Sequence, residues 1–244
     1  MRGEQIVFNE FNFFYFILPP IILAAGYTLR RRNFIKNLPF IVALGVLGTF
    51  ISMTVFSLLI IWTNSWEIEY QRLSSVECLV LASVLCATDT IAALTIVKEK
   101  DYPQLNAILF GEGIVNDAVS ILIFETIQKV FGKKPSREEE AASISGSDIG
   151  FALLHFIYLS VASIAIGIGF GMISAVITNK LVNFKKHPAR EIILIFIIAY
   201  LSYMTSEELS LSGIVTLFCC GFTMNHYTYY NLSEDSRNGS VLAI

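Results

Sequence analysis

One run of polar residues interrupts an apolar stretch of the chain and indicates chemistry there. Gly111-Glu112-Gly113-Ile114-Val115-Asn116-Asp117 lies inside Gln104 to Val130, which otherwise has the composition of a membrane-spanning helix. An ionised side chain near the bilayer centre costs about 2.5 to 3.5 kcal/mol, so such residues usually pair, line a water-filled path or react. Asp117 is therefore a functional candidate. The alternative is a polar contact in which Asn116 and Asp117 hydrogen-bond to a neighbouring helix.

A second acidic residue lies in the preceding apolar stretch, within Cys86-Ala87-Thr88-Asp89-Thr90. Threonines beside a buried aspartate are poor helix formers, and their hydroxyls can replace backbone partners where a helix opens. Secondary transporters build cation sites at such breaks, because unwound carbonyls and half-helix ends serve as ligands. The alternative is a continuous helix in which Asp89 pairs with a donor on a neighbour.

The two aspartates are expected at similar depth, because a short turn joins their spans and each helical residue rises about 1.5 Å. Glu112 and Asn116 share one helical face, whereas Asp117 points about 100° away from Asn116. Glycines on both sides of Glu112 leave room for another backbone or for water. A carboxylate that binds a monovalent cation can bind a proton instead, and this competition by itself couples the exchange of the two ions.

Composition places the chain in a lipid bilayer. Hydrophobic residues make up 55% of its 244 residues, charged residues only 15%, and the mean hydropathy is +0.64. No long basic run indicates nucleic-acid binding. No ATP-binding glycine loop, metal-ligand cluster or cofactor motif is present, which favours gradient-driven transport without a cofactor. The four cysteines lie in apolar stretches and are interpreted as small packing residues.

Apolar stretches of about 20 residues predict an all-α polytopic membrane protein with about seven spans. We expect a membrane domain over residues 1–131 that holds the ion-binding helices, a solvated loop over 132–148, further spans over 149–231 and a cytoplasmic segment over 232–244. Pro19 and Pro20 predict a helix break in the first span. Loop lysines and arginines predict that this span runs inward. The expected spans are Phe11–Leu29, Leu38–Trp62, Ser75–Val97, Gln104–Val130, Ile149–Thr178, Glu191–Met204 and Leu211–Tyr227.

These motifs, in this order, resemble the eukaryotic sodium (or potassium)/proton exchangers of the monovalent cation:proton antiporter superfamily, and most closely their vacuolar and endosomal branch. Thr90 stands where plasma-membrane members commonly have proline, which favours that branch. The matching segments are Phe16 to Ile22 with Ala25-Gly26-Tyr27, Ala87-Thr88-Asp89, Phe110 to Gly113, Asn116-Asp117-Ala118, Ala199 to Met204, Leu211 to Ile214, and Cys220-Gly221 with His226 to Thr228.

The resemblance implies a homodimeric, electroneutral antiporter with an inverted-repeat fold and a discontinuous crossing helix, which exchanges Na+ or K+ for H+ and controls the pH and cation content of an organelle. Asp117 would bind the transported cation or the proton, with Asn116 as its partner and Thr88 and Asp89 beside it. Glu112 and Glu207 would be supporting acids. Family members extend well past Ile244, so the second repeat and the regulatory tail are expected to be missing.

Two other interpretations remain open. Two aspartates at similar depth on adjacent spans are also the requirement of an intramembrane aspartyl protease, which would use Asp89 and Asp117. The Gly-x-Gly-Asp signature expected of such a protease is missing from the sequence. A non-transporting fragment is the second interpretation, and it predicts that Asp117 can be replaced without consequence.

Overall fold

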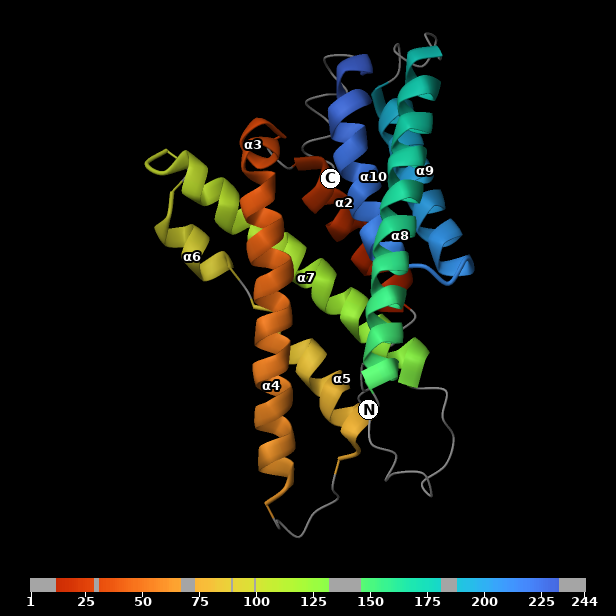
Figure 1. Cartoon of the computed structure of the whole chain (residues 1–244). Helices are drawn as coiled ribbons and strands as arrows, with labels where there is room; N and C mark the ends of the chain where they lie inside the picture. The colour runs from red at the N-terminus through yellow and green to blue at the C-terminus, as the bar shows by residue number, and fades with distance from the viewer. Residues whose placement is uncertain are drawn as a thin grey trace, which may run out of the picture. The chain divides into compact units, whose positions relative to one another are not determined.

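Helices form all the regular structure in the part of the chain that the computed structural model describes, which is residues 12–28, 31–66, 73–88, 90–98, 100–131, 146–180 and 188–232 (Figure 1). The predicted all-α class is confirmed. The elements are the π-helix η1 (Phe13–Ile17), α2 (Leu18–Thr28), α3 (Arg31–Val42), the π-helix η2 (Ala43–Leu47), α4 (Gly48–Asn64), α5 (Ser75–Leu85), α6 (Ile91–Ile96), α7 (Pro103–Phe131), α8 (Gly146–Lys180), α9 (Pro188–Glu208), α10 (Gly213–Tyr227) and the 3₁₀ turn η4 (Tyr229–Asn231).

Four helical segments among the described residues are long and apolar enough to cross a membrane. They are Phe34–Asn64, Pro103–Phe131, Ile149–Lys180 and Ala189–Glu208. The other three predicted spans correspond to shorter helices: the first to η1 and α2, the third to α5 and α6, and the last to α10. All seven apolar stretches are therefore helical, and the third is divided in two.

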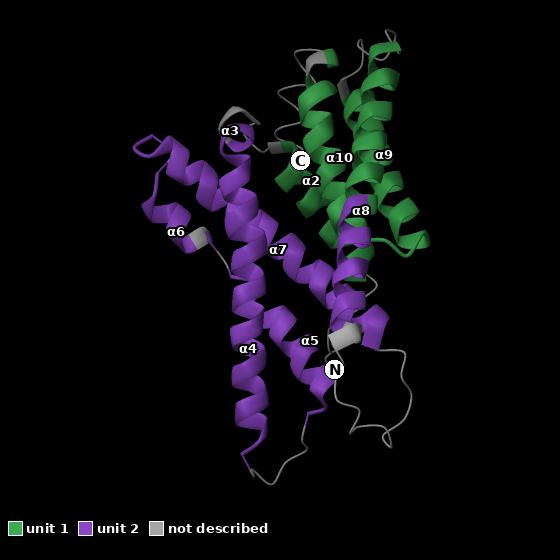
Figure 2. Cartoon of the chain, in the orientation of Figure 1, with its two compact units in different colours: residues 1–29, 162–244 green, residues 30–161 purple. Residues whose placement is uncertain are grey.

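The chain forms two compact units (Figure 2). Unit 1 comprises residues 1–29 and 162–244, and unit 2 comprises residues 30–161. The long helix α8 contributes its first part to unit 2 and its second part to unit 1. The predicted loop 132–148 lies mostly outside the described residues, as does the predicted cytoplasmic segment 232–244 after Leu232.

In unit 1, α10 packs against α2 and α9. Glycines let the backbones approach: a Cβ on Gly26 would lie 2.5 Å from Phe218 O, and one on Gly221 would lie 3.1 Å from Leu23 O. Leu23, Ile195 and Met224 are among the buried side chains of this core. Close approach of small residues is the usual way in which membrane helices associate, because lipid provides no hydrophobic drive between them.

The predicted helix break at Pro19 and Pro20 is not present as a gap, because α2 runs through both prolines. The irregularity is the π-helix η1 just before them. In the i→i+5 pattern of this π-helix the N–H groups of positions 19 and 20 would donate to Phe14 O and Tyr15 O, but neither proline has an N–H. Tyr203 Oη donates to Phe14 O at 3.1 Å, and Tyr200 Oη donates to Tyr15 O at 2.9 Å. Hydroxyls from α9 thus replace the missing backbone donors, and the helix continues.

In unit 2, α7 packs against α3, η2, α4, α5 and α6. Val119, Ile123 and Ile127 form the buried centre of this packing. Helix α5 begins with a capping box, in which Ser74 Oγ accepts from Glu77 N and Glu77 Oε2 accepts from Ser74 N. All four cysteines of the chain are free thiols.

Candidate functional site

The third predicted span is interrupted in the middle, where α5 ends at Leu85 and α6 begins at Ile91. The last carbonyls of a helix have no partner within that helix. Ser120 Oγ on α7 donates to one of them, Ser83 O, and Cys86 Sγ also approaches that oxygen, at 3.1 Å. The predicted discontinuous helix is therefore confirmed, and α7 supplies hydrogen bonds that compensate for the break.

Asn116 connects the break to another helix. Its Nδ2 donates to Thr88 Oγ1 at 2.7 Å, and its Oδ1 accepts from Thr49 Oγ1 at 2.6 Å. Thr49 Oγ1 also lies within hydrogen-bonding distance of Gly45 O in the π-helix η2. Asn116 and Thr49 are 3% and 2% exposed, respectively, so the bond between these two side chains is shielded from solvent. Both the oxygen and the nitrogen of the Asn116 amide are hydrogen-bonded, so this side chain connects α4 to the unwound segment.

Two glycines let α7 approach its neighbours closely around Glu112. A Cβ on Gly111 would lie 2.6 Å from Ile41 Cδ1, and one on Gly113 would collide with Thr90 Oγ1. The sequence indicated that these glycines leave room beside Glu112. The structure identifies what occupies that room: a side chain of α3 and a threonine of the break.

The carboxylates near the break differ in their surroundings. Asp117 is the residue after Asn116 and is exposed, whereas Glu112 is half-buried on the same helix. Asp89 lies outside the described residues, so the prediction that Asp89 and Asp117 lie at similar depth stays a prediction. Of the predicted site residues, the structure brings Asn116 and Thr88 into contact, and Asp117 follows Asn116 on α7.

Glu207 belongs to unit 1, at the end of α9, and it contacts the start of the next helix. Its Oε1 accepts from Gly213 N, the first residue of α10, at 3.2 Å. A carboxylate at a helix N-terminus satisfies an orphan N–H and interacts favourably with the helix dipole. This geometry indicates a capping role for Glu207.

No group of three or more His, Cys, Asp or Glu side chains among the described residues is arranged to hold a resident metal ion.

Sequence reasoning missed Thr49. Its signal was available, because Gly48-Thr49 is a small and polar pair inside a predicted span. Threonines in membrane helices commonly bond to their own helix, however, so the pair did not by itself indicate a partner 67 residues away.

Comparison with known proteins gives a result that is consistent with the family resemblance of the sequence motifs. A family model described as "Sodium/hydrogen exchanger, transmembrane" matches residues 11–242. Sodium/hydrogen exchanger 4 of Arabidopsis thaliana is 36% identical over 232 residues, which cover 95% of this chain and 42% of that protein. The endosomal/prevacuolar sodium/hydrogen exchanger of Saccharomyces cerevisiae is 37% identical over 236 residues, which cover 96% and 36%, respectively. The chain thus spans well under half the length of these relatives.

Proposed function

The chain belongs to the sodium/hydrogen exchanger family, and from this membership we propose that the protein exchanges Na+ or K+ for H+ across a membrane by secondary active antiport. The family consists of transporters, not enzymes, and the relatives it matches are named as exchangers. The alternative of an intramembrane aspartyl protease finds no support in these relatives.

The finer proposal concerns the site. Asp117 holds either one monovalent cation or one proton, and we propose Thr88 Oγ1 and the carboxylate of Asp89 as further oxygen ligands of the cation. Asn116 positions the unwound segment. One carboxylate that carries one positive charge in either direction makes the exchange electroneutral. No cofactor takes part, because the competition of the two ions for Asp117 couples their movements.

One observation carries this proposal: the Asn116 amide ties Thr88, in a helix break, to Thr49 in α4, while the next residue presents an exposed carboxylate. Unwound backbone at membrane depth is tolerated where it is buried in protein or lines a water-filled cavity. A carboxylate next to such a break has the environment of a cation site in a secondary transporter.

A further part of the proposal concerns the membrane in which the protein acts and its oligomeric state. The protein acts in an endosomal or vacuolar membrane, where it controls the pH and cation content of the organelle, and the name of the Saccharomyces cerevisiae relative supports this location. It works as a homodimer, as the resemblance to the antiporter superfamily implies.

The test is ion exchange in proteoliposomes with the intact protein. An imposed proton gradient should drive Na+ or K+ uptake without a matching membrane current, and Asp117→Asn should abolish the uptake. Asp101→Asn is the matched control, because Asp101 is an exposed acid in the turn before α7. Uptake that persists in Asp117→Asn would refute the site, and uptake accompanied by net current would refute electroneutrality.

A further inference from the structure

Thr90 is the N-cap residue of α6, directly after the helix break, and the proposed cation ligands do not include it. A threonine at an N-cap usually turns its hydroxyl back to accept from the second or third N–H of its helix. Thr90 makes no such bond. Its backbone angles, φ −91° and ψ −1°, agree with this difference, because a residue that forms the cap is usually extended. The hydroxyl oxygen of Thr90 is therefore not used to cap α6.

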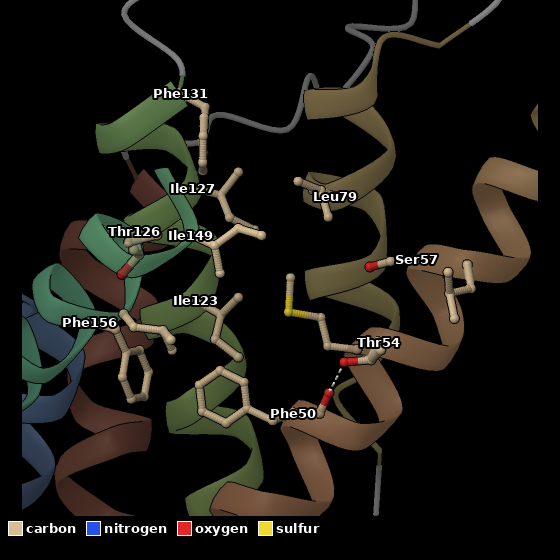
Figure 3. A pocket seen from close by; sticks show the side chains of 14 residues that line it. Phe50, Thr54, Ser57, Leu79, Ile123, Thr126, Ile127, Phe131, Ile149 and Phe156 are labelled. Atoms are coloured by element: carbon tan, nitrogen blue, oxygen red, sulfur yellow. Dashed lines mark hydrogen bonds between the residues drawn. The ribbon is translucent and has the colours of Figure 1, made fainter. Parts of the chain in front are cut away.

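Other threonine hydroxyls of unit 2 bond to their own helices. Thr54 donates to Phe50 O at 2.8 Å, beside the apolar cavity that Figure 3 shows. Thr95, in α6 itself, donates to Ala92 O at 2.7 Å. Such bonds to a carbonyl three or four residues earlier are common for threonines in membrane helices. Thr90 differs from these residues, because its side chain is directed at another helix.

The hydroxyl of Thr90 points toward α7. A Cβ on Gly113 would collide with Thr90 Oγ1, which is the atom of Thr90 nearest to that position. Thr90 is half-buried. Its oxygen makes no hydrogen bond to the described residues, yet it is not among their fully buried polar atoms without a partner. The oxygen is therefore accessible to an ion or to water.

The break follows the face of α7 that leads to Asp117. Thr90 meets α7 at Gly113, and Thr88 meets it at Asn116. Gly113 and Asp117 are four residues apart and therefore neighbours on one helical face, about one turn of ~5.4 Å from each other. A cation the size of Ca2+, which Na+ matches closely, lies ~2.3–2.6 Å from each oxygen ligand, so two opposite ligands are about 5 Å apart. One bound cation can bridge a separation of this size.

We propose that Thr90 Oγ1 is a further ligand of the transported cation, and that glycine at position 113 admits this oxygen to the site. The inference rests on the proposed antiport at Asp117. A hydroxyl adds an oxygen ligand without adding charge, so the exchange of one cation for one proton at a single carboxylate is unchanged.

The test is exchange by the intact protein in proteoliposomes, with initial rates measured over a range of Na+ and K+ concentrations. Thr90→Val removes the hydroxyl and nearly keeps the shape. It should raise the KM for the exchanged cation about two- to tenfold, the effect of one net polar contact, and change kcat little. Thr90→Ser should restore the native KM. Thr95→Val is the matched control and should behave as the native protein, because that hydroxyl is exposed and bonded to its own helix.

A double-mutant cycle tests the part played by Gly113. Gly113→Ala should also raise the KM, because the new Cβ displaces Thr90 Oγ1. In a Thr90→Ala background the same change should raise the KM no further, since no hydroxyl remains to be displaced.

Three results would overturn the inference and leave the antiport standing: a native KM in Thr90→Val, a KM in Thr90→Ser as high as in Thr90→Val, or additive effects of Gly113→Ala and Thr90→Ala. The absence of exchange in the native protein would overturn the antiport and this inference together.

Discussion

Replacing Thr49 by valine removes one buried hydroxyl and nearly preserves the shape of the side chain. In the native protein this hydroxyl lies 2.6 Å from Asn116 Oδ1, and both residues are almost fully buried. Valine leaves the amide oxygen without that donor in a site from which water is excluded. A buried acceptor left unsatisfied costs ~1–3 kcal/mol. We expect Thr49→Val to destabilise unit 2 by an amount in this range.

The loss should also appear in transport, because Asn116 connects α4 to Thr88 in the helix break. The assays are thermal unfolding of the purified protein in detergent and Na+-dependent exchange in proteoliposomes. Thr49→Val should lower the unfolding midpoint and raise the KM for the cation several-fold. Thr49→Ser keeps the hydroxyl and should restore both properties.

Thr54→Val is the matched control for the loss of a threonine hydroxyl from α4. Thr54 Oγ1 bonds only to a carbonyl of its own helix, Phe50 O, and the residue is exposed. Its replacement should have little effect on stability or on exchange. The proposed role of the Thr49–Asn116 bond is wrong if the two valine variants behave alike, or if Thr49→Ser is as impaired as Thr49→Val.

Two further predictions concern helix packing in unit 1, and thermal unfolding of the purified protein checks both. Gly167→Ala should destabilise by ~1–3 kcal/mol, because its Cβ would collide with Thr216 O and leave α10 no room. Gly169→Ala, two positions along α8, meets nothing within 4 Å and should be neutral or slightly stabilising; equal effects of the two would contradict the packing. Tyr200→Phe should destabilise by ~1–3 kcal/mol, because Tyr15 O then loses the hydroxyl that replaces the proline N–H; an unchanged midpoint would show that the carbonyl has another donor.

Local chemistry made the helix break predictable. Threonines next to an aspartate weaken a helix in lipid, and the break between Leu85 and Ile91 lies where Thr88 and Thr90 predicted it. The same reasoning did not predict the outcome at Pro19 and Pro20. Loss of two N–H donors is a local fact, but whether it breaks a helix depends on what lies nearby. Tyr200 and Tyr203 follow 185 and 189 residues after Tyr15 and Phe14, respectively, and satisfy the freed carbonyls.

The all-helical fold, the seven apolar stretches and the importance of the Asn116-Asp117 pair follow from the sequence by itself. Lipid offers no hydrogen bonds, so apolar stretches of this length become helices, and polar residues within them are costly enough to be conspicuous. Which partners those residues have was decided only by the tertiary structure. Thr49 meets Asn116 across 67 positions, and Ser57 Oγ has no hydrogen-bond partner among the described residues, because hydrogen bonds between helices depend on the distances and rotations at which the helices pack.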